Sequence, residues 1–280
     1  MSVVTGNRII ERVGSALGPH AAILRVAVGT PPDSTMMVGT LHVDGGAQLD
    51  AAIARWRAAD PHADPAVVPV NVLWAVAWAT LTPLVRLVAA ERLITDTDLA
   101  GIALETEPDD GGPWRAWWPA PVSATPCIEP DAAYADLVAR SLTAFGPLID
   151  AVRQRVRVGP RALWCRLVDV FADVGPRYQL ADPSRARDEI EAFARAAAGT
   201  RLGQHLRYVD FEHRGTARQL VRMTACCLAY TRSSDADPPP HPSSVGPWSA
   251  YCMTCPLVPE HETVRRARWW LDHADEDPAS

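Results

Sequence analysis

The sequence predicts an α+β fold. We expect an N-terminal part with a small antiparallel sheet and a long apolar helix, then a mainly helical part that ends in a cysteine-rich segment. Short strand-like segments gather in the first 118 residues, whereas helical spacing of apolar residues dominates from Pro130 onward. Strands and helices do not alternate regularly, so a parallel βαβ arrangement is not expected.

Length and charge narrow the choice of function. The chain has 280 residues, 48% of them hydrophobic, which is enough for one large or two small domains. We expect an α+β region at residues 1–128 and a helical region at residues 129–280, and the two can form one compact unit. The net charge of −6 argues against nucleic-acid binding. The chain has no Gly-rich phosphate loop and no G-x-S-x-G or H-E-x-x-H motif.

Local signals predict the first elements. Thr5 is suited to cap a short helix that ends near residue 14. Residues 21–29 and 35–44 have strand composition, and the turn Thr-Pro-Pro-Asp-Ser joins them. Residues 47–59 carry apolar side chains at helical spacing.

Residues 70–93 are predicted to form the long apolar helix. The run 66–85 contains no charged residue and has the length of a membrane span. It includes Pro69 and Asn71, however, and Arg86 follows at once. We therefore interpret it as a helix buried in a protein core, where helices are also apolar on all sides.

A strand pair and a helical region complete the prediction. Residues 98–107 alternate like a strand, and a turn at 109–112 leads to an aromatic partner strand at 114–118. The remaining expected elements are helices at 130–156, 160–174 and 184–198, strand-like segments at 206–213 and 218–230, a Pro/Ser-rich loop at 233–249 and a helix at 260–273.

Four cysteines near the C-terminus are the strongest functional signal. Cys226, Cys227, Cys252 and Cys255 form the pattern C-C-x24-C-x2-C. Four thiolates suit an iron–sulfur cluster or a tetrahedral zinc ion. The first residues show no basic segment followed by an apolar one, so we expect no secretory signal and a cytoplasmic location. Disulfides are rare there, which favours metal ligation.

This pattern resembles the C-terminal motif of the FhuF-like ferric-siderophore reductase family. In that family a hydrophobic-aromatic stretch follows the vicinal pair, as at 228–230, and Pro with an apolar residue follows the C-x-x-C, as at 256–257. Residues 161–164 (Arg-Ala-Leu-Trp) are similar to the Arg-x-Leu-Trp start of a helix in those proteins. Residues 73–74 and 81–84 are similar to their apolar segment.

The likeness covers residues 65–257, with one departure. The 24 residues between the two cysteine pairs are more than the family has, and the surplus lies in the loop 233–249. Because the entropy of loop closure grows only logarithmically with length, such an insertion is tolerable.

The resemblance implies a [2Fe–2S] cluster held by all four cysteines, with no catalytic residue beyond these ligands. It implies that the reduced cluster gives one electron to Fe³⁺ in a siderophore, and that Fe²⁺ leaves. The implied partners are a ferric siderophore, an electron donor such as a ferredoxin or a flavin-dependent reductase, and a membrane transporter in peripheral association. Arg222 and Arg232 flank the vicinal pair and are candidates to offset cluster charge.

Other interpretations stay open. The motif also fits a siderophore- or metal-binding protein with a structural zinc site on the same four cysteines, or an iron–sulfur redox sensor. Cys127 and Cys165 are interpreted as packed thiols, strand 114–118 as a sheet edge rather than a siderophore pocket, and His213 as a hydrogen-bonded side chain. The densest basic stretch is interpreted as a solvated helix end, with a ferredoxin-docking surface as the alternative: Arg153, Arg155, Arg157, Arg161 and Arg166.

Overall fold

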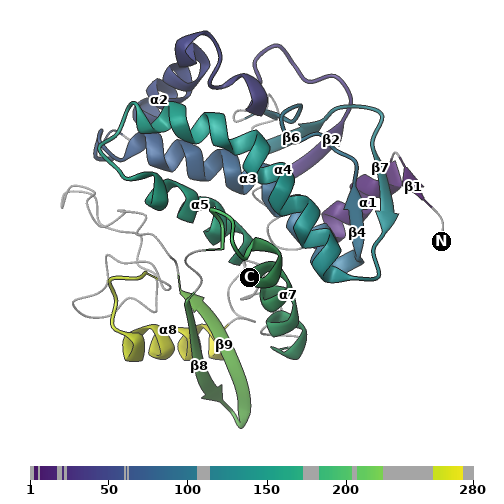
Figure 1. Ribbon diagram of the computed structural model, residues 1–280, viewed down its shortest axis with the longest axis vertical. Coiled ribbons are helices and arrows are strands. Elements are labelled where there is room, and N and C mark those ends of the chain that lie inside the picture. The colour runs from purple at the N-terminus through teal and green to yellow at the C-terminus, as the bar shows by residue number, and fades with distance from the viewer. Residues whose placement is uncertain are drawn as a thin grey trace.

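The long apolar segment folds as the central helix α3 (Val68–Glu91), which runs through the middle of the computed structural model (Figure 1). Pro69 lies in its first turn, where proline suits a helix start, and the helix ends before Arg92, whose backbone is left-handed. Of its most apolar 18-residue window, 89% is buried. In the part of the chain that the structure describes, α3 is the one helix long and apolar enough to cross a bilayer, and its burial is that of a core helix.

The structure describes residues 3–5, 7–17, 21, 24–59, 61, 63–105, 114–172, 183–203, 207–222 and 255–273. Over these residues the protein is a mixed α+β fold, as the sequence predicts.

Helices from both halves of the chain surround α3. The helices α1 (Asn7–Leu17) and α2 (Ala47–Ala59) pack against it from the N-terminal side of the sequence. From the C-terminal side α4 (Pro130–Arg153) and α5 (Pro160–Ala172) pack against it, and α7 (Pro183–Ala197) covers α4 (Figure 1). One continuous hydrophobic core therefore includes residues from α1 through the end of α7.

Two small sheets lie at one end of this helical layer. The first is antiparallel and contains β1 (Val4–Thr5), β7 (Ser123–Pro126) and β4 (Leu93–Thr95) in that order. Because β4 follows α3 directly, this sheet is joined to the end of the central helix.

The second sheet has four strands and is mixed. Its order is β2 (Leu24–Val28), β6 (Trp114–Trp118), β5 (Ala103–Glu105) and β3 (Met36–Met37). β6 pairs with β2 in parallel and with β5 antiparallel, and β3 pairs antiparallel with β5. The predicted pairing of the aromatic strand with the strand before it is thereby confirmed.

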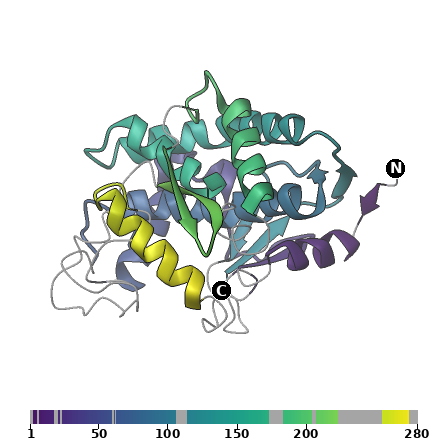
Figure 2. The same cartoon turned by 90° about the horizontal axis from the view of Figure 1, so that it is seen from below.

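The described C-terminal part forms a separate layer. The antiparallel hairpin of β8 (Arg207–His213) and β9 (Thr216–Arg222) packs through β8 against α8 (Glu260–His273). The hairpin also contacts α7 through β9, so this layer adjoins the helical side of the molecule (Figure 2).

Most predicted elements are confirmed, and the errors concern short strands. The helices at 47–59 and 260–273 have the predicted bounds. The strand predicted at 35–44 is wrong beyond Met37, because the chain turns into short 3₁₀ helices at Val38–Thr40 and Asp44–Gly46. Thr5 lies in β1 rather than capping α1. The predicted turn at 109–112 and loop at 233–249 lie outside the described residues.

Candidate functional site

The structure places one of the four predicted cysteine ligands. Cys255 stands at the start of the turn that leads into α8, and its side chain is buried. Cys226, Cys227 and Cys252 lie outside the described residues, so the four-cysteine site is not seen as a whole. Within the described ranges, no group of three or more His, Cys, Asp or Glu side chains is placed to hold a metal ion.

Arg222 connects β9 to the turn that begins at Cys255. It is the last residue of β9 and precedes Cys226 by four positions in the sequence. Its Nη2 donates to the backbone carbonyl oxygens of Cys255 (3.4 Å), Pro256 (3.0 Å) and Val258. The strand that precedes the vicinal pair in the sequence is thereby fastened to the turn that begins at Cys255. A guanidinium charge also lies beside that turn.

The turn after Cys255 is closed by a backbone hydrogen bond and leads into α8. Val258 donates its backbone N–H to the Cys255 carbonyl (3.2 Å), which closes the turn. In the first turn of α8, Glu262 accepts hydrogen bonds from Arg265 and from the buried Arg266. The hydrogen bond from Arg265, with that from Arg266, lowers the pKa of Glu262 to about 2. A carboxylate also suits the positive end of a helix, so α8 has a well-anchored start.

His213 has a structural partner. Its Nε2 lies 2.9 Å from Oδ1 of Asp272 near the end of α8, and Arg214 pairs with the same carboxylate at 2.7 Å. Arg268 donates to the carbonyl of Glu212 (3.0 Å). These contacts fasten the β8–β9 hairpin to α8, so the interpretation of His213 as a hydrogen-bonded side chain is confirmed.

The aromatic strand belongs to the sheet and core. Trp118 is fully buried. Trp117 donates its indole N–H to Oε2 of the buried Glu105 (2.9 Å), and Arg115 pairs with the same oxygen at 3.3 Å. These polar groups satisfy one another across the β5–β6 pair. The interpretation of strand 114–118 as a sheet edge is wrong, because β6 lies between β2 and β5 and pairs with both.

Two arginines of the basic stretch are engaged within the fold. Arg155 binds Asp50 through two nitrogens, at 2.6 and 3.0 Å, which lowers the pKa of that carboxyl. Arg166 is buried and pairs with Asp169 at 3.0 Å. Arg155 therefore ties the residues after α4 to α2, whereas the Arg166–Asp169 pair lies within α5. Arg166 also lies over the ring of Trp74 in α3, 5.6 Å from its centroid. For the buried Arg166, the interpretation as part of a solvated helix end is wrong.

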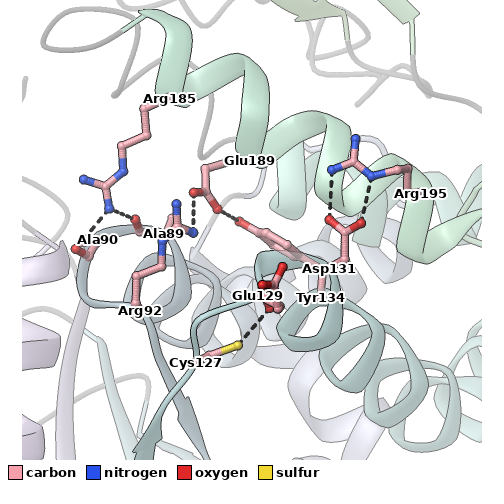
Figure 3. Close-up of polar contacts among 10 residues, drawn as sticks. All are labelled: Ala89, Ala90, Arg92, Cys127, Glu129, Asp131, Tyr134, Arg185, Glu189 and Arg195. Atoms are coloured by element: carbon pink, nitrogen blue, oxygen red, sulfur yellow. Dashed lines mark hydrogen bonds and ion pairs between the residues drawn. The ribbon is translucent and has the colours of Figure 1, made fainter.

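A polar cluster that the sequence did not reveal joins three helices. Glu189 of α7 is buried, accepts a hydrogen bond from Tyr134 of α4 (2.9 Å) and forms an ion pair with Arg92 after α3 (Figure 3). Burial raises the pKa of Glu189, and Arg92 and Tyr134 offset that rise only in part. Arg185 donates to the last carbonyls of α3, at Ala89 and Ala90. Because these residues lie far apart in the sequence, no local sequence pattern predicts that they meet.

A cavity of about 690 Å³ opens beside this cluster, between β1, α1 and the end of α3. Three arginines and one glutamate line it, and so does Cys127, whose thiol donates to the carbonyl of Glu129 (2.9 Å). Cys165 is buried in α5, as a packed thiol is expected to be.

Compared with models of protein families and with curated proteins, the chain matches none.

Proposed function

We propose that the protein is a cytoplasmic ferric-siderophore reductase that holds a [2Fe–2S] cluster through Cys226, Cys227, Cys252 and Cys255. The observation that carries the proposal is the C-C-x24-C-x2-C pattern, with its flanking residues. When bound, such a cluster supplies single electrons. Fe³⁺ bound by hard oxygen ligands is released more readily once it is reduced to Fe²⁺.

The described residues fit this ligand set. Cys255 is shielded from water, and a buried thiol is suited to a site from which solvent is excluded. Arg222 fastens the Cys255 turn to the strand that precedes the vicinal pair, and its charge offsets the negative charge of four thiolates. In this proposal the protein's own side chains orient the ligands and tune the site.

Electron exchange requires that partners approach the ligands. Leu257, two residues after Cys255, is 50% exposed, so the turn that begins at a buried ligand reaches the surface within two residues. We place the contact with the electron donor, a ferredoxin or a flavin-dependent reductase, at this turn. The ferric siderophore and a peripherally associated membrane transporter complete the proposed partners.

Replacement of one ligand tests the proposal. Cys252→Ser removes a thiolate, so the variant purified without oxygen should lose most of its iron, inorganic sulfide and visible absorption. Cys127→Ser is the matched control, because it makes the same atomic change at a thiol just after β7 and a hydroxyl can also donate to Glu129. The control should keep full iron, sulfide and colour.

The same samples separate the alternatives. A colourless wild-type protein with one zinc ion per chain would replace the proposal with a structural zinc site. Iron and sulfide in Cys252→Ser at wild-type levels would contradict the ligand assignment. A cluster whose reduced form is reoxidised no faster by ferric hydroxamates than by buffer would indicate a redox sensor.

A further inference from the structure

We propose that the cavity between β1, α1 and the end of α3 binds a small organic anion that carries two or more carboxylate or phosphate groups. Its volume, about 690 Å³, lies within the range of small-molecule sites. The inference does not depend on the proposed function, because none of the residues that line the cavity belongs to β8, β9 or α8. In both views β1 and α1 lie towards one side of the molecule and α8 towards the other (Figures 1 and 2).

The charges that line the cavity favour an anion. Arg8, Arg12 and Arg92 line it, against the single carboxylate of Glu91. Glu91 pairs with Arg12, whose side chain remains 50% exposed. Guanidinium groups bind carboxylates and phosphates through two parallel N–H donors, so several of them together favour a ligand with more than one anionic group.

Both the side chain and the backbone of Arg92 are held in place by polar contacts. Its guanidinium pairs with Glu189, which is buried and fixed by the hydroxyl of Tyr134 (Figure 3). Its backbone carbonyl accepts from the Cys127 N–H (2.7 Å). A side chain ordered before the ligand arrives loses less conformational entropy on binding, which strengthens the site.

The end of α3 would oppose an anion, and Arg185 offsets this effect. The C-terminal end of a helix carries partial negative charge on its last carbonyls. Arg185 donates to two of them, at Ala89 and Ala90, and so neutralises the helix end close to Arg92 (Figure 3).

The walls of the cavity select an organic body. Val3, Val4, Leu93 and Pro126 line it together with the arginines. Such a surface gains from contact with carbon atoms, and an inorganic ion alone would leave these walls in water. We therefore expect a compact molecule with anionic groups at its periphery.

Calorimetric titration of the purified full-length protein tests the inference. The probes are tricarballylate, a tricarboxylate without the hydroxyl that makes citrate chelate iron strongly, and glucose 6-phosphate, at constant ionic strength. We expect saturable binding of at least one probe, and the probe that binds identifies the anionic group. Arg8→Gln and Arg12→Gln should each weaken this binding about tenfold or more, since each removes a charged hydrogen-bond donor.

Arg153→Gln is the control, because it removes the same charge from an exposed position on α4. It should leave affinity unchanged, and thermal melts should show all three variants folded. The inference is overturned if neither probe binds saturably, or if Arg153→Gln weakens binding as much as both cavity variants do.

Discussion

At the scale of single residues, we expect substitution of Arg222 to have the largest effect on how firmly the protein retains iron. Nη2 of Arg222 lies within hydrogen-bond distance of three carbonyl oxygens of the Cys255 turn, which share its two hydrogens. A hydrogen bond from a charged donor contributes about 1.5–3 kcal/mol. Arg222→Gln should leave the fold intact but loosen the turn. Residues that support metal ligands typically change metal affinity about 10–100-fold, so we expect faster loss of iron to a chelator by a factor in this range.

Arg207 offers the matched control for this experiment. It lies directly opposite Arg222 in the β8–β9 pair and is exposed. Arg207→Gln removes the same charge from the same hairpin but from a residue with no contact to the Cys255 turn among those described. Equal rates of iron loss in the two variants would show that Arg222 acts through general charge and not through the turn.

At the scale of elements, the Glu189 cluster governs how α7 is held to α3 and α4. Because burial raises the pKa of Glu189 above that of an unfolded chain, its neutral form suits the fold best. Its contribution to stability is therefore complete at low pH, below the unfolded pKa, and is lost as pH rises through the folded pKa. Glu189→Gln keeps the shape and cannot ionise, so the variant should gain stability relative to the wild type as pH rises from about 4 to about 7.

Urea unfolding of both proteins across this pH range measures the difference. The wild type must be measured alongside the variant, because other carboxyl groups change the stability with pH in the opposite direction. The pKa of Asp50 and that of Glu262 are lowered, so their contributions are lost as pH falls. Glu191→Gln, at an exposed position on α7, should show no such trend. A gain of Glu189→Gln at low pH instead would contradict the account.

Helices were predictable from the sequence, whereas most strand partners were not, and the pair β5–β6 is the exception. The bounds of α2 and α8 follow from periodicity over 13 and 14 residues, which is a strong local signal. β4 has only three residues and gives no such signal. The strand predicted at 35–44 fails because Val38 and Gly39 donate to Ile102 and Ala100, a tertiary contact that turns the chain. The parallel pairing of β2 with β6 joins segments about 90 residues apart.

The candidate site also has one part that the sequence predicts and another that only the structure shows. The cysteine pattern is local, so the sequence alone supports it as a hypothesis. The role of Arg222 in bracing Cys255 joins positions 33 residues apart and needed the structure. The arginine-lined cavity is assembled from residues 3–12, 91–93 and 126–127, none of which has a distinctive local pattern.

At the scale of the whole molecule, a continuous core supports a peripheral layer that would do the chemistry. Residues from α1 to α7 share this core, while β8, β9 and α8 form a layer held together by contacts such as His213–Asp272. The pair Arg187–Asp210 (3.5 Å) joins this layer to α7. Cys255 is buried, Leu257 two residues later is half exposed, and neither residue lines the arginine-lined cavity. Redox chemistry and anion binding are therefore proposed as independent properties of one protein.

The electron paramagnetic resonance spectrum of the dithionite-reduced protein, prepared without oxygen, tests the central claim most directly. A [2Fe–2S] centre on four cysteines predicts one unpaired electron per chain, with a signal that disappears on reoxidation. A folded sample that gives no such signal and contains neither iron nor sulfide would contradict the account.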